Sequence, residues 1–189
     1  SVRELLSGAK YAIDYYQREY KWERKQVAEL LDDLTSKFRE SHVPTDDRGE
    51  VEKYSHYFLG SIIISQKDGV NYIVDGQQRL TTLTLLLIYL NHLQHELLED
   101  QRVKIDELIY SAKYGKKSFN IQVEEREACM NALFEVTPFD AESQPEAIRN
   151  LVARYDDIGE LFPDEIASAS LPFFIDWLIE NVHLVEITA

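Results

Sequence analysis

The sequence has a single cysteine, Cys129, among its 189 residues. One cysteine excludes an intramolecular disulfide, and the lack of Cys/His ligand spacing around it excludes a zinc ribbon. The sequence also lacks an apolar run of the roughly 20 residues that span a bilayer, and its first residues show no basic segment followed by an apolar core. We therefore expect a cytoplasmic protein with no membrane partner.

Positive charge is scarce as well, because 20 Lys and Arg stand against 34 Asp and Glu, which gives a net charge of −14. Such an excess normally argues against nucleic-acid binding. The excess is uneven: residues 1–121 carry 17 basic and 19 acidic side chains, a net of −2, whereas residues 122–189 carry 3 and 15, a net of −12. A phosphate ligand or nucleic-acid contact is expected only on the N-terminal portion, unless a missing segment or a partner supplies a basic surface.

The 44% hydrophobic content is ordinary for a folded chain, and its periodicity predicts both helices and strands. Predicted helices are Val2–Ser7, Lys25–Phe38, Leu80–Leu90, Lys104–Tyr110, Glu124–Phe134, Glu146–Tyr155 and Asp164–Asn181. Predicted strands are Tyr11–Asp14, Tyr57–Ser65, Tyr72–Val74 and His183–Thr188, and residues 41–53 read as an exposed loop. Ser143 with Glu146 is a candidate capping box.

These elements predict an α+β fold with three parts. Residues 1–100 form a core in which the predicted strands pack on a buried central helix. Residues 101–182 form an acidic, mostly helical subdomain, and residues 183–189 form a strand that returns to the core sheet. Because the last strand ends with the sequence, we expect the chain to be cut from a longer protein.

A polar corner joins the strand Tyr72–Val74 to the leucine-rich helix. Asp75 followed by Gln78 fits an N-terminal capping pair, with Asp75 as the cap and the next three residues as the first helical turn. Free amides and the positive end of the helix dipole make an anion site there, and Arg79 adds a full charge. The alternative is that Asp75 and Gln78 only cap the helix while Arg79 pairs with a carboxylate.

Two other features suggest a ligand without requiring one. Four of the eight residues in Tyr15–Trp22 are Tyr or Trp, so this stretch either covers the core as an aromatic plug or lines a ligand with Gln17 and Arg18. Gly60, within a predicted strand, marks a bulge or a close approach of backbone or ligand, or is a plain packing glycine.

Three motifs in order, Tyr16–Trp22, Phe58–Ile62 and Asp75–Leu83, resemble the N-terminal domain of the GmrSD-type restriction endonucleases. That family is similar in fold to ParB and sulfiredoxin proteins, which implies a small mixed sheet with helices and a phosphate site at the helix after the polar corner. It also implies a role in phage defence and an association with NTP-dependent cleavage of modified DNA, often with a C-terminal HNH nuclease.

The resemblance implies catalytic roles for Asp75, Gln77, Gln78 and Arg79 and nucleotide-binding roles for Tyr16, Gln17, Arg18, Gly76, Arg79 and Thr81. The implied cofactor is Mg²⁺ with the NTP. Asp75 would hold the metal directly or through water, the arginines would hold phosphate oxygens, and Gln77 or Gln78 would orient the attacking water. One departure stands out: Ile13-Asp14 replaces the family's Ile-Pro, which loosens the approach to Tyr16 and adds a negative charge near the anion site.

We therefore expect a nucleotide-binding, NTP-hydrolysing domain of a DNA-targeting phage-defence protein, with Mg²⁺ as cofactor. The alternative is a non-catalytic nucleotide- or DNA-sensing module that controls a nuclease partner. The five histidines form no HNH pattern, and no carboxylate cluster recurs with Lys or His at nuclease-like spacing. Cleavage of DNA is accordingly expected from a missing C-terminal domain or a partner, and the sequence predicts no oligomeric state.

Overall fold

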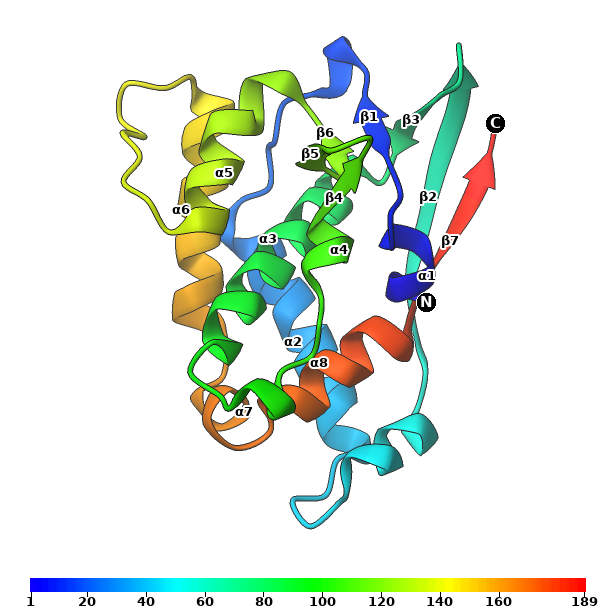
Figure 1. The fold of residues 1–189 in the computed structure, drawn as a ribbon, viewed down its shortest axis with the longest axis vertical. Coiled ribbons are helices and arrows are strands. Elements are labelled where there is room, and N and C mark those ends of the chain that lie inside the picture. Colours follow the sequence, from blue (N-terminus) through cyan, green and yellow to red (C-terminus); the bar gives the residue numbers. More distant parts are fainter.

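The computed structural model describes residues 1–189, except for the side chain of residue 113. A five-stranded sheet lies on one side of the molecule, and most of the helices pack on one of its faces (Figure 1). The sheet order is β6-β1-β3-β2-β7. Its strands are β1 (Tyr11–Ile13), β2 (Tyr57–Lys67), β3 (Val70–Asp75), β6 (Ile121–Gln122) and β7 (Val182–Thr188). The α+β prediction is confirmed.

Three adjacent strands run in the same direction. β1 pairs in parallel with β3 and with β6, with Ile13 opposite Ile73 and Tyr11 opposite Ile121. β2 is antiparallel to β3, and β7 is parallel to β2. The carboxyl ends of β6, β1 and β3 therefore meet at one edge of the sheet. We call the segments that follow them, residues 123–126, 14–18 and 76–79, the carboxyl edge.

The helix α3 (Gln77–Gln94) is the centre of the molecule. Twelve of its 18 residues are buried, and they occur on all sides of the helix rather than along one stripe. A helix that is apolar all round must be covered by other elements on every side, which explains why the leucine run lies between the sheet and the outer helices. The predicted buried central helix is thus present and begins at the carboxyl edge.

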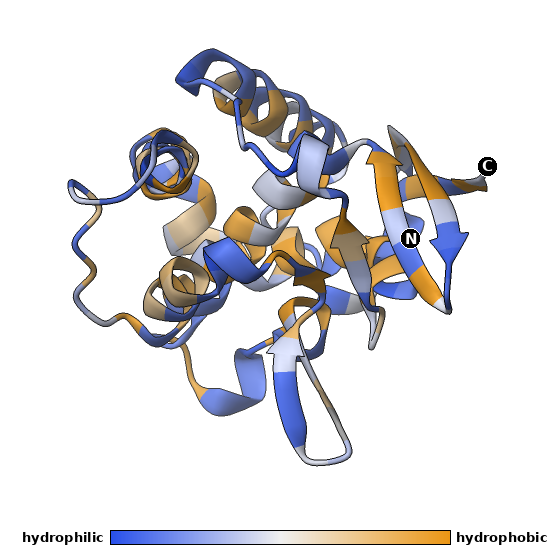
Figure 2. Cartoon of the chain, turned by 90° about the horizontal axis from the view of Figure 1, so that it is seen from above, coloured by the Kyte–Doolittle hydropathy of each residue, from blue (hydrophilic) through white to orange (hydrophobic). Residues whose placement is uncertain are grey.

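The other helices surround α3, and their apolar sides face inward while their polar sides face solvent (Figure 2). They are α1 (Val2–Leu6), α2 (Arg24–Ser41), α4 (Asp106–Ile109), α5 (Glu127–Glu135), α6 (Glu146–Leu161), α7 (Asp164–Ala169) and α8 (Leu171–Glu180). Short 3₁₀ helices are η1 (Tyr15–Gln17), η2 (Arg48–Lys53), η3 (Glu99–Gln101) and η4 (Glu124–Arg126). No helix in the described residues has the length and apolar character to cross a bilayer.

The predicted helix Lys104–Tyr110 is mostly wrong. Only Asp106–Ile109 is helical, and the chain then forms a hairpin of β4 (Tyr110–Lys113) and β5 (Lys116–Phe119). Tyr110 and Phe119 lie opposite each other in its register, and both rings pack against Phe134 of α5. Tertiary ring packing therefore outweighs the local helical pattern.

The single predicted helix Asp164–Asn181 is two helices, α7 and α8, separated at Ser170. Pro172 explains the break, because proline cannot donate to the preceding turn and its ring clashes with the carbonyl four residues earlier. It is tolerated where it lies, in the first turn of α8.

Two smaller predictions also need correction. The Ser143–Glu146 capping box is absent, because α6 begins after Pro145 and the Ser143 hydroxyl donates to the Asp140 carbonyl instead. The loop predicted at residues 41–53 contains η2.

Candidate functional site

The chain turns from β3 into α3 at Gly76. Its φ of 94° is left-handed, and a Cβ built there would lie 2.8 Å from the Cγ2 of Ile62 and 3.2 Å from the Ser61 carbonyl. Asp75 is still part of β3, opposite Ile63, so Gly76 is the N-cap and no side chain caps the helix. The predicted Asp75 cap is wrong because the strand continues one residue further than expected.

The missing cap leaves the start of α3 open to an anion. The first intrahelical bond joins the Leu80 amide to the Gly76 carbonyl at 3.0 Å. The amides of Gln77, Gln78 and Arg79 therefore have no acceptor within the helix, and the helix dipole places positive potential on them. An anionic ligand oxygen would satisfy these donors.

The Gln78 side chain does not take part in a capping pair. Its Oε1 accepts from the Lys21 amide and its Nε2 donates to the Glu19 carbonyl, both at 2.8 Å. Both ends of the carboxamide are thus used to fasten residues 18–22, which we call the connector, to the first turn of α3. Two of the three sequence motifs are consequently in direct contact.

Other side chains hold the connector in the same way. The Arg18 carbonyl accepts from Arg126 at 2.5 Å, the Tyr20 carbonyl from Asn150 at 3.0 Å and the Trp22 carbonyl from Arg154 at 3.1 Å. An irregular segment needs such partners for its backbone groups.

Arg18 is held at the carboxyl edge. Its Nε donates to the Ile13 carbonyl at 2.9 Å, and its Nη1 donates to both carboxylate oxygens of Glu125, at 2.8 and 3.2 Å. A backbone hydrogen bond and the Arg18 charge together lower the pKa of Glu125. The neighbouring η1 residues project outward: Gln17 is exposed, and Tyr16 is 92% exposed.

Sequence reasoning missed Arg126, which is only 5% exposed. Its Nη1 donates to the Thr81 hydroxyl at 2.9 Å, and burial lowers its pKa to about 10. Thr81, a predicted nucleotide-binding residue, is 2% exposed and lies against this guanidinium. A sequence signal existed, because Arg126 is one of only three basic residues in the strongly acidic range 122–189.

Arg79 lies against Gly60 of β2. A Cβ built on Gly60, whose φ is 151°, would overlap the Arg79 guanidinium, and the register of β2 with β7 shifts between Phe58 and Gly60. The predicted bulge is therefore present at Gly60, but the group that approaches it closely is the Arg79 side chain rather than backbone or a ligand. No side chain in the described part of the chain forms a hydrogen bond or ion pair with the Arg79 guanidinium. The alternative in which Arg79 pairs with a carboxylate is not what the structure shows.

Asp75 and Gln77 differ in their exposure to solvent. Asp75 is exposed and its carboxylate has no partner among the described side chains; Gln77 is half-buried. Asp14 follows β1 just as Asp75 ends β3, so two carboxylates lie at the ends of adjacent parallel strands. Mg²⁺ bound with a phosphate substrate usually takes one or two carboxylates, and Asp75 is the exposed carboxylate next to the start of α3.

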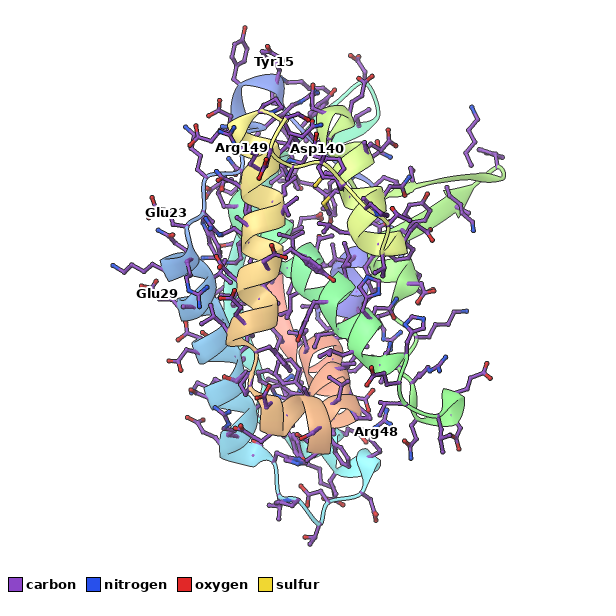
Figure 3. The ribbon with its side chains drawn as sticks, turned by 90° about the vertical axis from the view of Figure 1, so that its left-hand side faces the viewer. Tyr15, Glu23, Glu29, Arg48, Asp140 and Arg149 are labelled. Atoms are coloured by element: carbon purple, nitrogen blue, oxygen red, sulfur yellow. The ribbon has the colours of Figure 1, made fainter. Side chains whose placement is uncertain are left out.

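Two cavities flank Arg18, and Arg126 lines both. One, of about 370 Å³, is also lined by Gln122, Glu124 and Glu127. The other, of about 490 Å³, is more apolar and includes the aromatic η1 residues. In Figure 3, Tyr15 stands out at this end of the molecule.

The structure brings some predicted site residues together and separates others. Gln78 binds the connector, and Arg126 joins the connector to Thr81. Arg18, however, is held by Glu125 beside β6, whereas Arg79 lies over β2, two strands away from β1 in the sheet. The two arginines do not share an ion-pair partner.

A family model described as GmrSD restriction endonuclease, N-terminal domain, matches residues 2–189. The chain belongs to this family. The resemblance of the three motifs is thereby confirmed. The chain is a domain of a phage-defence protein of the restriction-endonuclease class. None of the curated proteins matches it.

In this GmrSD N-terminal domain all three motifs meet around the first turn of α3. Gly60 of the second motif accommodates Arg79 of the third, and Gln78 of the third holds the backbone of the first. The motifs are therefore neighbours in space as well as in sequence order.

Proposed function

We propose that this domain binds a nucleoside triphosphate at the carboxyl edge and hydrolyses it with Mg²⁺, as part of a DNA-targeting defence protein. The observation that supports this most directly is the uncapped N-terminus of α3, with Arg79 unpaired in its first turn and the Asp75 carboxylate exposed beside it. Donors, a cation and a hard oxygen ligand are the parts that a metal-bound triphosphate requires.

Each residue has a stated task in this proposal. The free amides of α3 and the Arg79 guanidinium bind phosphate oxygens, and Asp75 holds Mg²⁺ directly or through water. The metal neutralises charge that develops on the transferred phosphoryl group. Gln77 orients the water. Arg18 approaches the ligand from the neighbouring strand end, beside the apolar cavity that suits a base or sugar.

One observation favours a second candidate, a nucleotide-sensing module without turnover. Both ends of the Gln78 carboxamide are bound to connector backbone, so this side chain is not available to orient water. Ligand binding at the edge would then act through the connector on a nuclease domain or partner, which in either candidate is where we place DNA cleavage.

The test is phosphate release by the purified protein with Mg²⁺ and each NTP. We expect Arg79→Ala to reduce release by roughly 100-fold or more, because a charge-stabilising donor to the reacting phosphate is lost. Arg39→Ala is the matched control, since Arg39 is exposed and pairs with Glu165 away from the edge. Removal of Mg²⁺ with EDTA should abolish release.

The outcomes separate the candidates. Nucleotide binding by calorimetry without phosphate release supports the sensing module. Unchanged release in Arg79→Ala would contradict the proposed site, and a full-length protein that shows neither binding nor release would contradict both candidates.

A further inference from the structure

The β4–β5 hairpin is a basic feature on an acidic chain. Residues 113–117 read Lys-Tyr-Gly-Lys-Lys, three lysines in five residues with no acidic residue, whereas the chain as a whole carries −14. The hairpin stands away from the body of the molecule, at the lower edge of Figure 2 and to the right in Figure 3. The nucleotide site proposed above does not include the tip of the hairpin and does not explain its lysines.

The base of the hairpin is firmly anchored. The Tyr110 and Phe119 rings pack against Phe134, with the Tyr110 and Phe134 rings stacked at 5.5 Å. From the other side, the Lys10 ammonium donates to the Ser111 carbonyl at 3.2 Å and to the Ser118 carbonyl at 2.7 Å. A rigid base presents the tip in a fixed direction, which reduces the entropy lost on binding a partner.

The residues at the tip are not the ones that stabilise this type of turn best. Tyr114 and Gly115 form the turn with φ values of 53° and 76°, a pair of positive angles that favours Asn-Gly. Tyrosine is disfavoured at a positive φ. The Tyr114 side chain is 94% exposed, so burial in the core does not explain why a tyrosine is present at this position. Lys116 and Lys117 are exposed, and no described side chain forms an ion pair with either ammonium.

We propose that this hairpin is a docking element for double-stranded DNA, with its tip in the major groove and its lysines on phosphates. A two-stranded ribbon fits the major groove of B-form DNA, whereas the major groove of A-form RNA is too narrow to admit one. Lys116 and Lys117 neutralise backbone phosphates, the Lys10 charge adds to the local positive potential, and Tyr114 reaches toward base edges or sugars.

The position of the hairpin relates this surface to the carboxyl edge. Ser118 and Phe119 of β5 line the same cavity as Arg18 and Arg126. A duplex bound at the tip would therefore lie next to the edge. The domain itself would contribute DNA contacts, and they would lie within residues 1–121, the part of the chain on which the charge distribution allows a nucleic-acid contact.

The experiment measures binding of a fluorescein-labelled DNA duplex by anisotropy over a range of salt concentrations. We expect Lys116→Gln/Lys117→Gln to weaken binding roughly tenfold and to reduce the slope of log K against log[salt] by about two, one for each phosphate contact. Lys37→Gln/Lys53→Gln is the matched control, because it removes the same charge from two exposed-surface ion pairs with Glu40 and Glu50.

Several results would overturn the proposal. One is an equal loss of DNA affinity in both double variants, and another is an unchanged salt slope in the hairpin variant. A third is a duplex RNA of the same sequence that binds as tightly as the DNA. Salt-dependent self-association that is lost in the hairpin variant, without DNA binding, would assign the surface to an acidic face of a second copy instead. NTP binding is expected to be the same in the hairpin variant and the parent, so failure here is distinguishable from failure of the nucleotide site.

Discussion

At the scale of single residues, the site depends on two glycines that make room for other groups. Gly76 lets β3 turn directly into α3 without a side-chain cap, and Gly60 leaves the space that the Arg79 guanidinium occupies. Both have positive φ values that disfavour other residues. Neither role requires a ligand, but both place donors where an anion can reach them.

Gly60→Ala tests the contact between Gly60 and Arg79. We expect the free energy of unfolding to fall by about 1–2 kcal/mol, because the new Cβ is strained at this φ and overlaps Arg79. The displaced guanidinium should also weaken NTP binding. Urea denaturation and nucleotide titration measure the two effects.

Gly49→Ala is the control for that variant. Gly49 has no atom within 4 Å of a built Cβ and does not have a positive φ. If both alanine variants lose the same stability, the contact between Gly60 and Arg79 does not explain the requirement for glycine.

At this scale the sequence predicts the polar corner before α3, but it does not predict which groups its side chains bind. The polar corner and its positive charge were predicted from Asp75 to Arg79, but Gln78 binds backbone 57 residues earlier in the chain. A capping pattern is a local rule, and it cannot anticipate an acceptor supplied by another segment.

At the scale of elements, the periodic helix α2 and the short strand β1 were predicted from the sequence, whereas the strands β4, β5 and β6 were not. The apolar spacing in α2 predicts its buried face, which includes Val27, Leu30 and Leu34. β6, in contrast, has two residues, and only its pairing with β1 makes it a strand. Because the sequence does not predict β6, it also does not predict the segment that follows β6 at the carboxyl edge, which contains Glu125 and Arg126.

The contact between α3 and the connector can be tested with Gln78→Ala. Loss of two hydrogen bonds to backbone should lower the free energy of unfolding by about 1–2 kcal/mol and speed amide exchange at Lys21. Hydrogen exchange read by mass spectrometry over residues 14–22 measures the local effect.

Gln77→Ala provides the neighbouring comparison, since its side chain forms no hydrogen bond with the described residues. Equal protection of the connector in both variants would show that Gln78 does not hold it.

At the scale of the whole molecule, one hydrophobic cluster includes residues from Val2 to Leu184. It draws on all three parts that the sequence predicted, and the fully buried side chains of Tyr20, Phe38 and Trp177 belong to it. Shared cores make neighbouring parts of a chain unfold together.

We therefore expect a single cooperative unfolding transition. Calorimetry, far-ultraviolet and near-ultraviolet circular dichroism should give the same midpoint, and the calorimetric and van't Hoff enthalpies should agree. Two resolved transitions would instead support separate units at residues 1–100 and 101–182.

The connector has a consequence for mutational tolerance. Its carbonyls at Arg18, Glu19, Tyr20 and Trp22 are each held by a side chain from a distant element, so its path does not depend on its own exposed side chains. Charge or size can change at Glu19 or Lys21 without altering that path. Substitutions in the partners, far away in the sequence, would move it, so the positions that control this segment lie outside it.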